Sequence, residues 1–158
     1  MSVLRFLMLL SLVVWVGGII FFAFVLAPAV FSVLPSRHLA GNVVNRALPA
    51  LHWMGVVSGV VYVGTSLTYA RLQTGSTEFL AARHLAICAM IVLTLVSQFA
   101  VGGKMVALRN QMGVIDDVSQ SDPRRLEFNR LHEWSTRLEG AVLVLGLAAL
   151  YLTARRLT

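Results

Sequence analysis

Apolar residues in this chain are gathered into four blocks that are separated by short polar segments. Each block is close to the roughly 20 residues that an α-helix needs to cross a bilayer. The pattern predicts membrane spans over approximately 6–33, 49–69, 84–103 and 134–154. We therefore expect an all-α fold, an integral membrane four-helix bundle that occupies residues 1–158 as a single transmembrane domain.

Two prolines predict where the first two spans are irregular or begin. Pro28 removes the N–H that would pair with the carbonyl of Phe24, which predicts a kink in the first span. Pro49 suits the first turn of a helix, so the second span is expected to start there. The polar segment before it is also compatible with a separate surface helix over 38–47.

The fourth apolar block is too short to cross a bilayer by itself. Its uncharged part, from Gly140 to Ala154, has 15 residues, against the roughly 20 that a span needs. The span must therefore begin near Trp134, and Arg137 and Glu139 then fall inside its first turns. Arg137 is expected to pair with Glu133 one turn earlier or to extend to the membrane interface.

The polar segment before this span carries a helix-start pattern. Ser121 or Asp122 suits the cap position, Pro123 suits the first turn, and Glu127 follows soon after. We therefore expect one long helix that begins near Pro123 outside the membrane and continues through the fourth span.

Composition supports a membrane protein and argues against a nucleic-acid partner. Hydrophobic residues make up 58% of the chain and charged residues 13%, about half the charged share of a soluble domain. The net charge of +6 comes from arginines and lysines between the apolar blocks, where membrane proteins normally carry them. The lipid bilayer is the expected partner, and a homo-oligomer or a larger membrane complex is left open.

Four spans place both termini on one side of the membrane. The joints 35–47 and 104–133, with the charged start of the fourth span, hold 8 arginines and lysines against 5 on the side of the termini. This count favours a cytoplasmic location for those two joints. The apolar run of the first span is longer than a signal-peptide core of about 7–15 residues, so we expect the first helix to be retained.

Helical periodicity places polar and small residues on shared faces. The second, third and fourth spans each carry one such stripe. In chain order these stripes are His52, Gly55 and Gly59; His84, Cys88, Gln98 and Gly102; and His132, Ser135, Glu139 and Gly146. Cys88 has no second cysteine to pair with and is expected to be a small core residue.

The ends of the spans divide these residues between the two halves of the bundle. His52 and His132 lie at span ends on the same side of the membrane, and Glu139 lies about 10 Å deeper than His132. Gln98 has a similar depth on the third span. His84 lies at the opposite end, where we expect it at the interface. One half of the bundle is therefore expected to hold a cluster of His52, Gln98, His132 and Glu139.

Several chemistries suit this cluster. His52 and His132 could ligate haem b iron axially, or they could bind copper or zinc with Glu139 or Met54 as a further ligand. Glu139 could instead carry a proton, because an ionisable residue inside a span is a functional hypothesis by default. The alternative is structural: interface histidines, a hydrogen bond from Gln98 between helices, and an acid paired with an arginine.

Small residues in the first two spans indicate close helix packing. Gly17 and Gly18, together with Gly55 and Gly59 in "GVVSG", are the candidates. No Walker loop, His-Glu-x-x-His, Cys-x-x-Cys or Gly-x-Ser-x-Gly motif is present. The chain is therefore more readily interpreted as a binding protein, a transporter or an accessory subunit than as an enzyme.

Three segments carry a family resemblance: "WVGGIIFFAFVLAPAVF" (15–31), "NRALPALHWMG" (45–55) and "NRLHEWSTRLEG" (129–140). Together they resemble the transmembrane-protein-205-like group of four-helix membrane proteins, a domain of unknown function. The Trp-x-Gly-Gly start is also similar to the membrane domain of copper-resistance D proteins. Those proteins are larger, and this chain has no additional Met- or His-rich segment.

The resemblance implies four helices, a multi-pass location in a bacterial inner membrane and no established reaction. It implies that His132 is the family's histidine of the fourth-helix region and that Pro28 is the proline of its first helix. Haem-binding four-helix membrane oxidases are a looser likeness, carried by intramembrane histidines alone. The expected function is binding or transport of a metal ion or a proton-coupled solute, with a b-type haem redox protein and an accessory subunit as alternatives.

Overall fold

The computed structural model describes residues 2–76 and 79–157, and over these residues it contains helices and turns without any strand. The elements are α1 (Ser2–Phe21), the π-helical turn η1 (Phe22–Leu26), α2 (Ala27–Val33), α3 (Arg37–Thr74), α4 (Ala82–Leu95), the π-helical turn η2 (Val96–Gly102), α5 (Gly103–Met112), the 3₁₀ turn η3 (Ile115–Asp117) and α6 (Pro123–Leu157). They form four long helical segments, each long and apolar enough to cross a membrane, so the expected all-α membrane bundle is confirmed.

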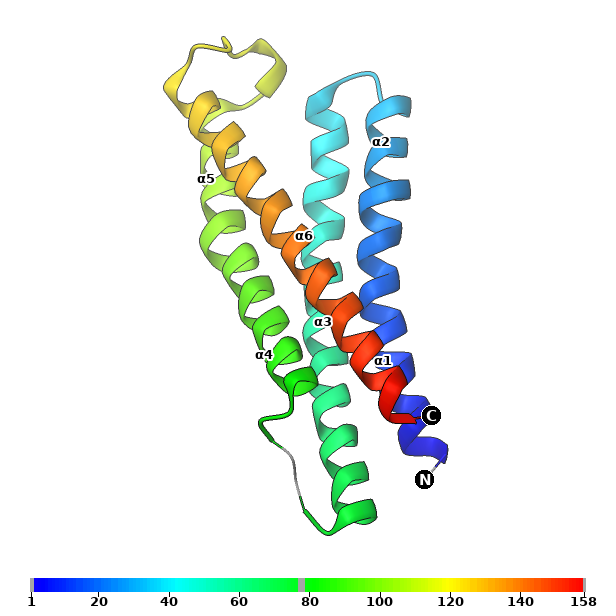
Figure 1. Cartoon of the computed structure of the whole chain (residues 1–158). Coiled ribbons are helices and arrows are strands. Elements are labelled where there is room, and N and C mark those ends of the chain that lie inside the picture. The colour runs from blue at the N-terminus through cyan, green and yellow to red at the C-terminus, as the bar shows by residue number, and fades with distance from the viewer. Residues whose placement is uncertain (1, 77–78, 158) are drawn as a thin grey trace.

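The two ends of the bundle differ in how closely the helices approach one another. Both termini lie at one end with the α3–α4 connection, and the α2–α3 and α5–α6 connections lie at the other (Figure 1). Near the termini, α1 packs on α3 and α6, and α4 packs on α3 and α6. At the far end, α2 and α3 form one pair and α5 and α6 another, and the two pairs lean apart (Figure 1).

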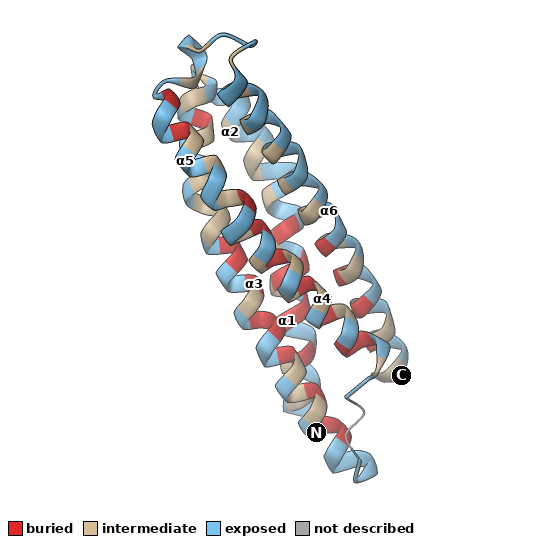
Figure 2. Cartoon of the chain, turned by 90° about the vertical axis from the view of Figure 1, so that its left-hand side faces the viewer, coloured by how far each residue is buried: buried red, intermediate tan, exposed pale blue. Residues whose placement is uncertain are grey.

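The core is concentrated in the half that holds the termini. Buried side chains line the facing sides of the four segments there, while the outer faces are exposed and apolar (Figure 2). The largest fully buried side chains are Trp15, Tyr62 and Tyr69. An apolar exterior of this kind suits a chain whose helices are surrounded by lipid.

Glycines set the spacing between α1 and α3. A Cβ added to Gly55 would lie 2.3 Å from Nε1 of Trp15, and one added to Gly59 would lie 2.6 Å from the same indole ring. Gly18 is similarly close to side chains of α3, at 2.8 Å. Gly17 differs from the prediction that it is a packing glycine. It lies on the exposed face of α1, and an added Cβ would meet nothing within 4 Å.

The structure is irregular just before Pro28, as the sequence predicts, but it places Pro49 differently. Before Pro28 the chain forms a π-helical turn in which the Ala27 N–H bonds the Phe22 carbonyl, so the first span is irregular at this point. Pro49 lies inside α3 rather than in its first turn. The segment expected as a separate surface helix is thus continuous with the second span, because one missing N–H does not end a helix that neighbouring helices support.

Two residues of α4 differ in their burial from what the sequence predicts. Cys88 is exposed rather than a core residue. The buried face of α4 passes through Ile87, Met90 and Thr94, which places Cys88 about 100° away from Ile87 around the helix. His84 is only 2% exposed, and its Nε2 lies 2.8 Å from Oγ of Ser66, so it is a buried polar residue rather than an interface residue.

The start of α6 agrees with the expected capping pattern. The Asp122 carboxylate accepts a hydrogen bond from the Arg124 backbone N–H at 2.8 Å, and Pro123 is the first helical residue. The Arg124 guanidinium also donates to this carboxylate at 2.7 Å and thereby lowers the pKa of Asp122 to about 2. Further along, the guanidinium of Arg137 lies 2.5 Å from Glu133, the expected pairing one turn back.

Candidate functional site

A buried histidine joins three of the four helical segments. His52 on α3 is 4% exposed. Its Nε2 lies 2.6 Å from Oε1 of Glu139 on α6, and its Nδ1 lies 2.6 Å from Oε1 of Gln98 on η2. These three residues, named here the imidazole triad, come from the sequence-predicted cluster.

The two hydrogen-bond partners of His52 restrict which atoms of the imidazole triad can carry protons. Both neighbouring atoms are oxygens, so in one arrangement His52 donates from both nitrogens to a Glu139 carboxylate and to the Gln98 carbonyl. In the other, a protonated Glu139 donates to Nε2 and His52 still donates to Gln98. The two arrangements hold the same number of protons and the same net charge of zero. They differ only in the position of one proton along the 2.6 Å hydrogen bond.

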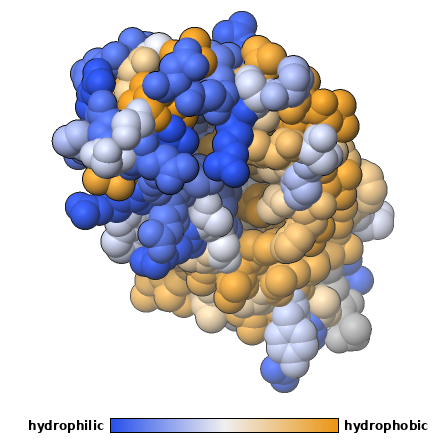
Figure 3. All heavy atoms as spheres, turned by 90° about the horizontal axis from the view of Figure 1, so that it is seen from above, coloured by the Kyte–Doolittle hydropathy of each residue, from blue (hydrophilic) through white to orange (hydrophobic). Residues whose placement is uncertain are grey.

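The imidazole triad lies in the wall of a cavity of about 490 Å³ between the two helix pairs that lean apart. All four segments contribute to the cavity. Its polar lining includes His52, Ser97, Gln98, His132, Ser135 and Glu139. Its apolar lining includes Phe22, Phe31, Val44, Leu48, Met105 and Val106. Seen from this end, hydrophilic side chains gather over the α5–α6 connection and apolar ones over the opposite side (Figure 3).

Both π-helical turns border this cavity. Phe22 begins η1, and Ser97 and Gln98 belong to η2. A π-helical turn inserts an extra residue into the helix and so rotates the side chains that follow it. The turn in η2 contributes Gln98, whose amide reaches His52, and Ser97, whose hydroxyl is buried. Sequence periodicity assumes a regular α-helix and therefore does not reveal this rotation.

His132 lies on the cavity wall but is not a direct partner of His52. It precedes Glu139 by seven residues on α6 and therefore lies about 10 Å nearer the open end. Both ring nitrogens of His52 already bond Gln98 and Glu139. Arg137 is on another face of α6, with its guanidinium 5.5 Å from the Trp134 ring centroid.

The cavity residues do not fit haem or a bound copper or zinc ion. An axial or metal-binding imidazole needs a free ring nitrogen, and both nitrogens of His52 take part in hydrogen bonds. Within residues 2–76 and 79–157, no three His, Cys, Asp or Glu side chains gather as a metal site. The side chains of His52, His132 and Glu139 therefore do not form one coordination sphere.

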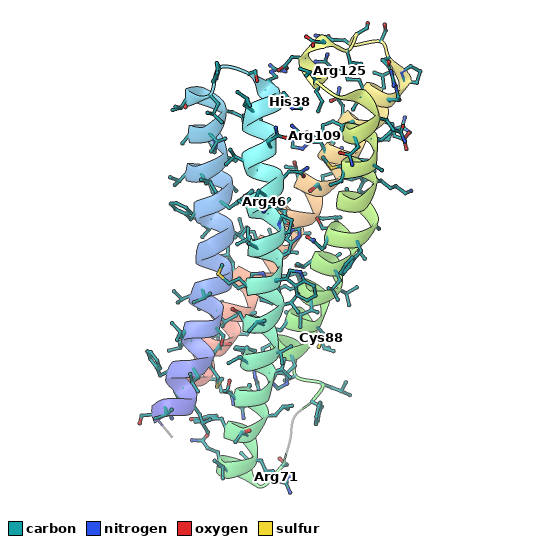
Figure 4. The ribbon with its side chains drawn as sticks, turned by 180° about the vertical axis from the view of Figure 1, so that it is seen from behind. His38, Arg46, Arg71, Cys88, Arg109 and Arg125 are labelled. Carbon is teal, nitrogen blue, oxygen red and sulfur yellow. The ribbon has the colours of Figure 1, made fainter. Side chains whose placement is uncertain are left out.

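Sequence reasoning missed a contact between α3 and α5 that lies about one helical turn beyond the cavity residues Asn45 and Val106. Arg109 on α5 is buried, and its Nη2 donates to the His38 carbonyl of α3 at 2.6 Å (Figure 4). The His38 N–H donates to Oδ2 of Asp116 on η3 at 3.1 Å. Gly41 gives the guanidinium room, since an added Cβ would lie 2.8 Å from both terminal nitrogens. These four residues are named here the α3–α5 clasp.

One signal in the sequence points to the clasp. Arg109 is a charged residue close behind an apolar span, and such residues are commonly held by a specific partner. That partner is the backbone of His38, and no side-chain pattern marks a backbone acceptor in the sequence.

Comparison with protein families identifies residues 10–113 as the Domain of unknown function (DUF4149). This match covers more than half of the chain, so the chain belongs to that family. The matched segment contains His52 and Gln98, whereas Glu139 lies beyond it. No curated protein and no solved structure matched the chain. These comparisons add no support for the resemblance to transmembrane-protein-205-like or copper-resistance D proteins.

Proposed function

We propose that this multi-pass membrane protein of the DUF4149 family binds a solute inside the bilayer and couples that binding to a proton held by the imidazole triad. The observation that carries the proposal is the 2.6 Å contact between His52 and Glu139 at the wall of a cavity of about 490 Å³. A titratable pair beside a cavity can exchange its proton with whatever enters that cavity.

The membrane environment supports the proton role. A lone carboxylate in the bilayer is costly, so acids inside spans are paired or protonated. The His52–Glu139 pair keeps net charge zero whether the shared proton is on nitrogen or oxygen. Loss of that proton leaves one negative charge on the pair, which rebinding of a proton would neutralise and a hydrogen-bond donor on the solute would stabilise.

The cavity supports this proposal more than it supports an accessory or purely structural role. A hydrogen bond that only joins helices works equally well when side chains fill the space around it. Here the pair borders open space that is lined by all four segments. A cavity of about 300–1,000 Å³ is the usual size of a small-molecule site.

The experiment is infrared difference spectroscopy of the purified protein in nanodiscs, titrated from about pH 4 to about pH 10. We expect one carboxyl signal that disappears in Glu139→Gln and changes position in His52→Gln. Glu133→Gln is the matched control, because Glu133 lies on the same helix, is 62% exposed and pairs with Arg137. The control is expected to keep the Glu139 signal.

Identical titrations for the wild type and Glu139→Gln would overturn the proposal, because Glu139 would then exchange no proton. A signal that Glu139→Gln removes but His52→Gln leaves unchanged would also overturn it, since the pair would not share the proton. Thermal unfolding of each variant establishes that it is folded. The bacterial inner-membrane location and a homo-oligomer or larger complex stay predictions.

A further inference from the structure

The cavity offers no arginine or lysine side chain to an anionic solute. Among its lining residues there is no arginine or lysine, and the acid it contains, Glu139, is paired with His52. A phosphate or carboxylate entering it would lose its hydration without gaining an ion pair. The lining therefore favours an occupant without a negative charge, and a neutral molecule meets this condition.

The cavity has a polar side and an apolar side. Ser97, Gln98, Ser135 and the His52–Glu139 pair provide the polar side, and aromatic and aliphatic side chains provide the other. Small-molecule sites usually combine an apolar wall with a few polar groups that orient the ligand. A molecule with one hydrogen-bonding head and an apolar body matches this division.

Ser97 supplies a second observation that points to a ligand. Its side chain is 2% exposed and lines the cavity, and its Oγ has no hydrogen-bond partner among the described residues. Buried hydroxyl groups are nearly always hydrogen-bonded. A ligand head that hydrogen-bonds Ser97 beside Gln98 and His52 would satisfy this hydroxyl.

The route into the cavity leads from the lipid. Phe31 and Val106 line the cavity and remain 46% and 44% exposed, so apolar side chains that are still accessible form part of its wall. Towards the α2–α3 and α5–α6 connections, Arg109 and Asp116 bond His38 and so join α3 to the α5 side of the bundle. A lipid-soluble molecule can enter between the helix pairs without passing this clasp.

We infer that the solute is a lipid-soluble quinone, with its ring against Ser97 and the imidazole triad and its tail extending past Phe31 and Val106 into the bilayer. This inference rests on the proposed function and names its solute class. A quinone ring is neutral, and its oxygens accept hydrogen bonds when oxidised and donate them when reduced. The shared proton of His52 and Glu139 and the hydroxyl of Ser97 can pair with either form.

The test is isothermal titration of nanodisc-embedded protein with a short-tailed ubiquinone analogue, with empty nanodiscs subtracted. We expect saturable binding of one quinone per protein. The same ring without a tail, and a fatty acid of matched tail length, should each bind about tenfold more weakly or not at all. Equal binding of the fatty acid would overturn the quinone assignment, as would heat indistinguishable from empty nanodiscs.

Variants of cavity residues test whether the quinone binds in this cavity. Gly103 lines the cavity and an added Cβ would meet nothing within 4 Å, so Gly103→Leu should fill the space and weaken quinone binding about tenfold or more. Gly17→Leu is the matched control, because Gly17 is equally unobstructed but lies on α1 outside the cavity lining. Ser97→Ala is expected to weaken binding about threefold to tenfold.

Equal quinone affinity in Gly103→Leu and Gly17→Leu would overturn the assignment to this cavity. The infrared experiment on ligand-free protein separates the two proposals. If the Glu139 signal is present and quinone does not bind, the solute class is wrong and the proton site stands. If quinone binds in this cavity without a Glu139 signal, the proton coupling is wrong and the cavity stands as a quinone site.

Discussion

Nε2 of His52 on α3 lies 2.6 Å from Oε1 of Glu139 on α6, although the two residues are 87 positions apart in the chain. The contact joins the second and fourth membrane segments beside a cavity that all four segments line. We therefore expect the contact to contribute both to the stability of the bundle and to the proposed proton exchange at its candidate site. Each contribution can be measured.

The coupling between His52 and Glu139 should contribute to stability. A double-mutant cycle of His52→Ala and Glu139→Ala is expected to give a coupling free energy of about 1–3 kcal/mol, because residues in direct contact are not additive. The measurement is reversible unfolding in mixed detergent micelles. The exposed Glu133–Arg137 pair on α6 is the control and should give about 0–0.5 kcal/mol. Equal coupling for the two pairs would contradict this expectation.

Close packing of Trp15 against Gly55 should be sensitive to one added methyl group. Gly55→Ala would place a Cβ 2.3 Å from the indole nitrogen, and we expect it to lower the free energy of unfolding by about 1–3 kcal/mol. Gly64→Ala has nothing within 4 Å and should be neutral or stabilising by up to about 1 kcal/mol. In the double variant, Trp15→Leu should remove the further loss of unfolding free energy that Gly55→Ala causes. If it does not, a clash with Trp15 is not the cause of that loss.

The Asp122 carboxylate, which caps the start of α6, should titrate at low pH. The Arg124 guanidinium lowers the pKa of Asp122 to about 2, so the carboxylate supports the start of α6 at neutral pH. Because the folded pKa lies below the unfolded value, this support is lost as the pH falls from about 4 through about 2. Carbon NMR of labelled aspartate should show the low pKa in the wild type and in Arg130→Ala. Arg124→Ala should return it towards about 3.9.

Opening the α3–α5 clasp should admit water to the cavity. Arg109→Ala removes the hydrogen bond to the His38 carbonyl, and Gly41→Ala displaces the guanidinium that packs there. In a Cys88→Ser background, Asn45→Cys on the cavity wall should react several-fold faster with a water-soluble thiol reagent once either change is made. Unchanged labelling in both variants would show that the clasp does not limit access of water.

The main features of the fold could be predicted from local sequence. Four apolar blocks must become four helices, because a bilayer leaves backbone polar groups no partner outside their own helix. The start of α6 at Pro123 was equally readable, since Asp122 and Pro123 act within one turn. The depth of Glu139 followed from the short uncharged run behind it, which requires the span to begin earlier.

Which side chains meet was decided only by the tertiary structure. The sequence placed His52, Gln98, His132 and Glu139 in one half of the bundle, but it did not specify the rotation of each helix about its axis. That rotation depends on contacts between distant segments, such as Trp15 against Gly55, and on the π-helical turn that contributes Gln98. These contacts bring His52 to Glu139 and leave His132 about 10 Å away along α6.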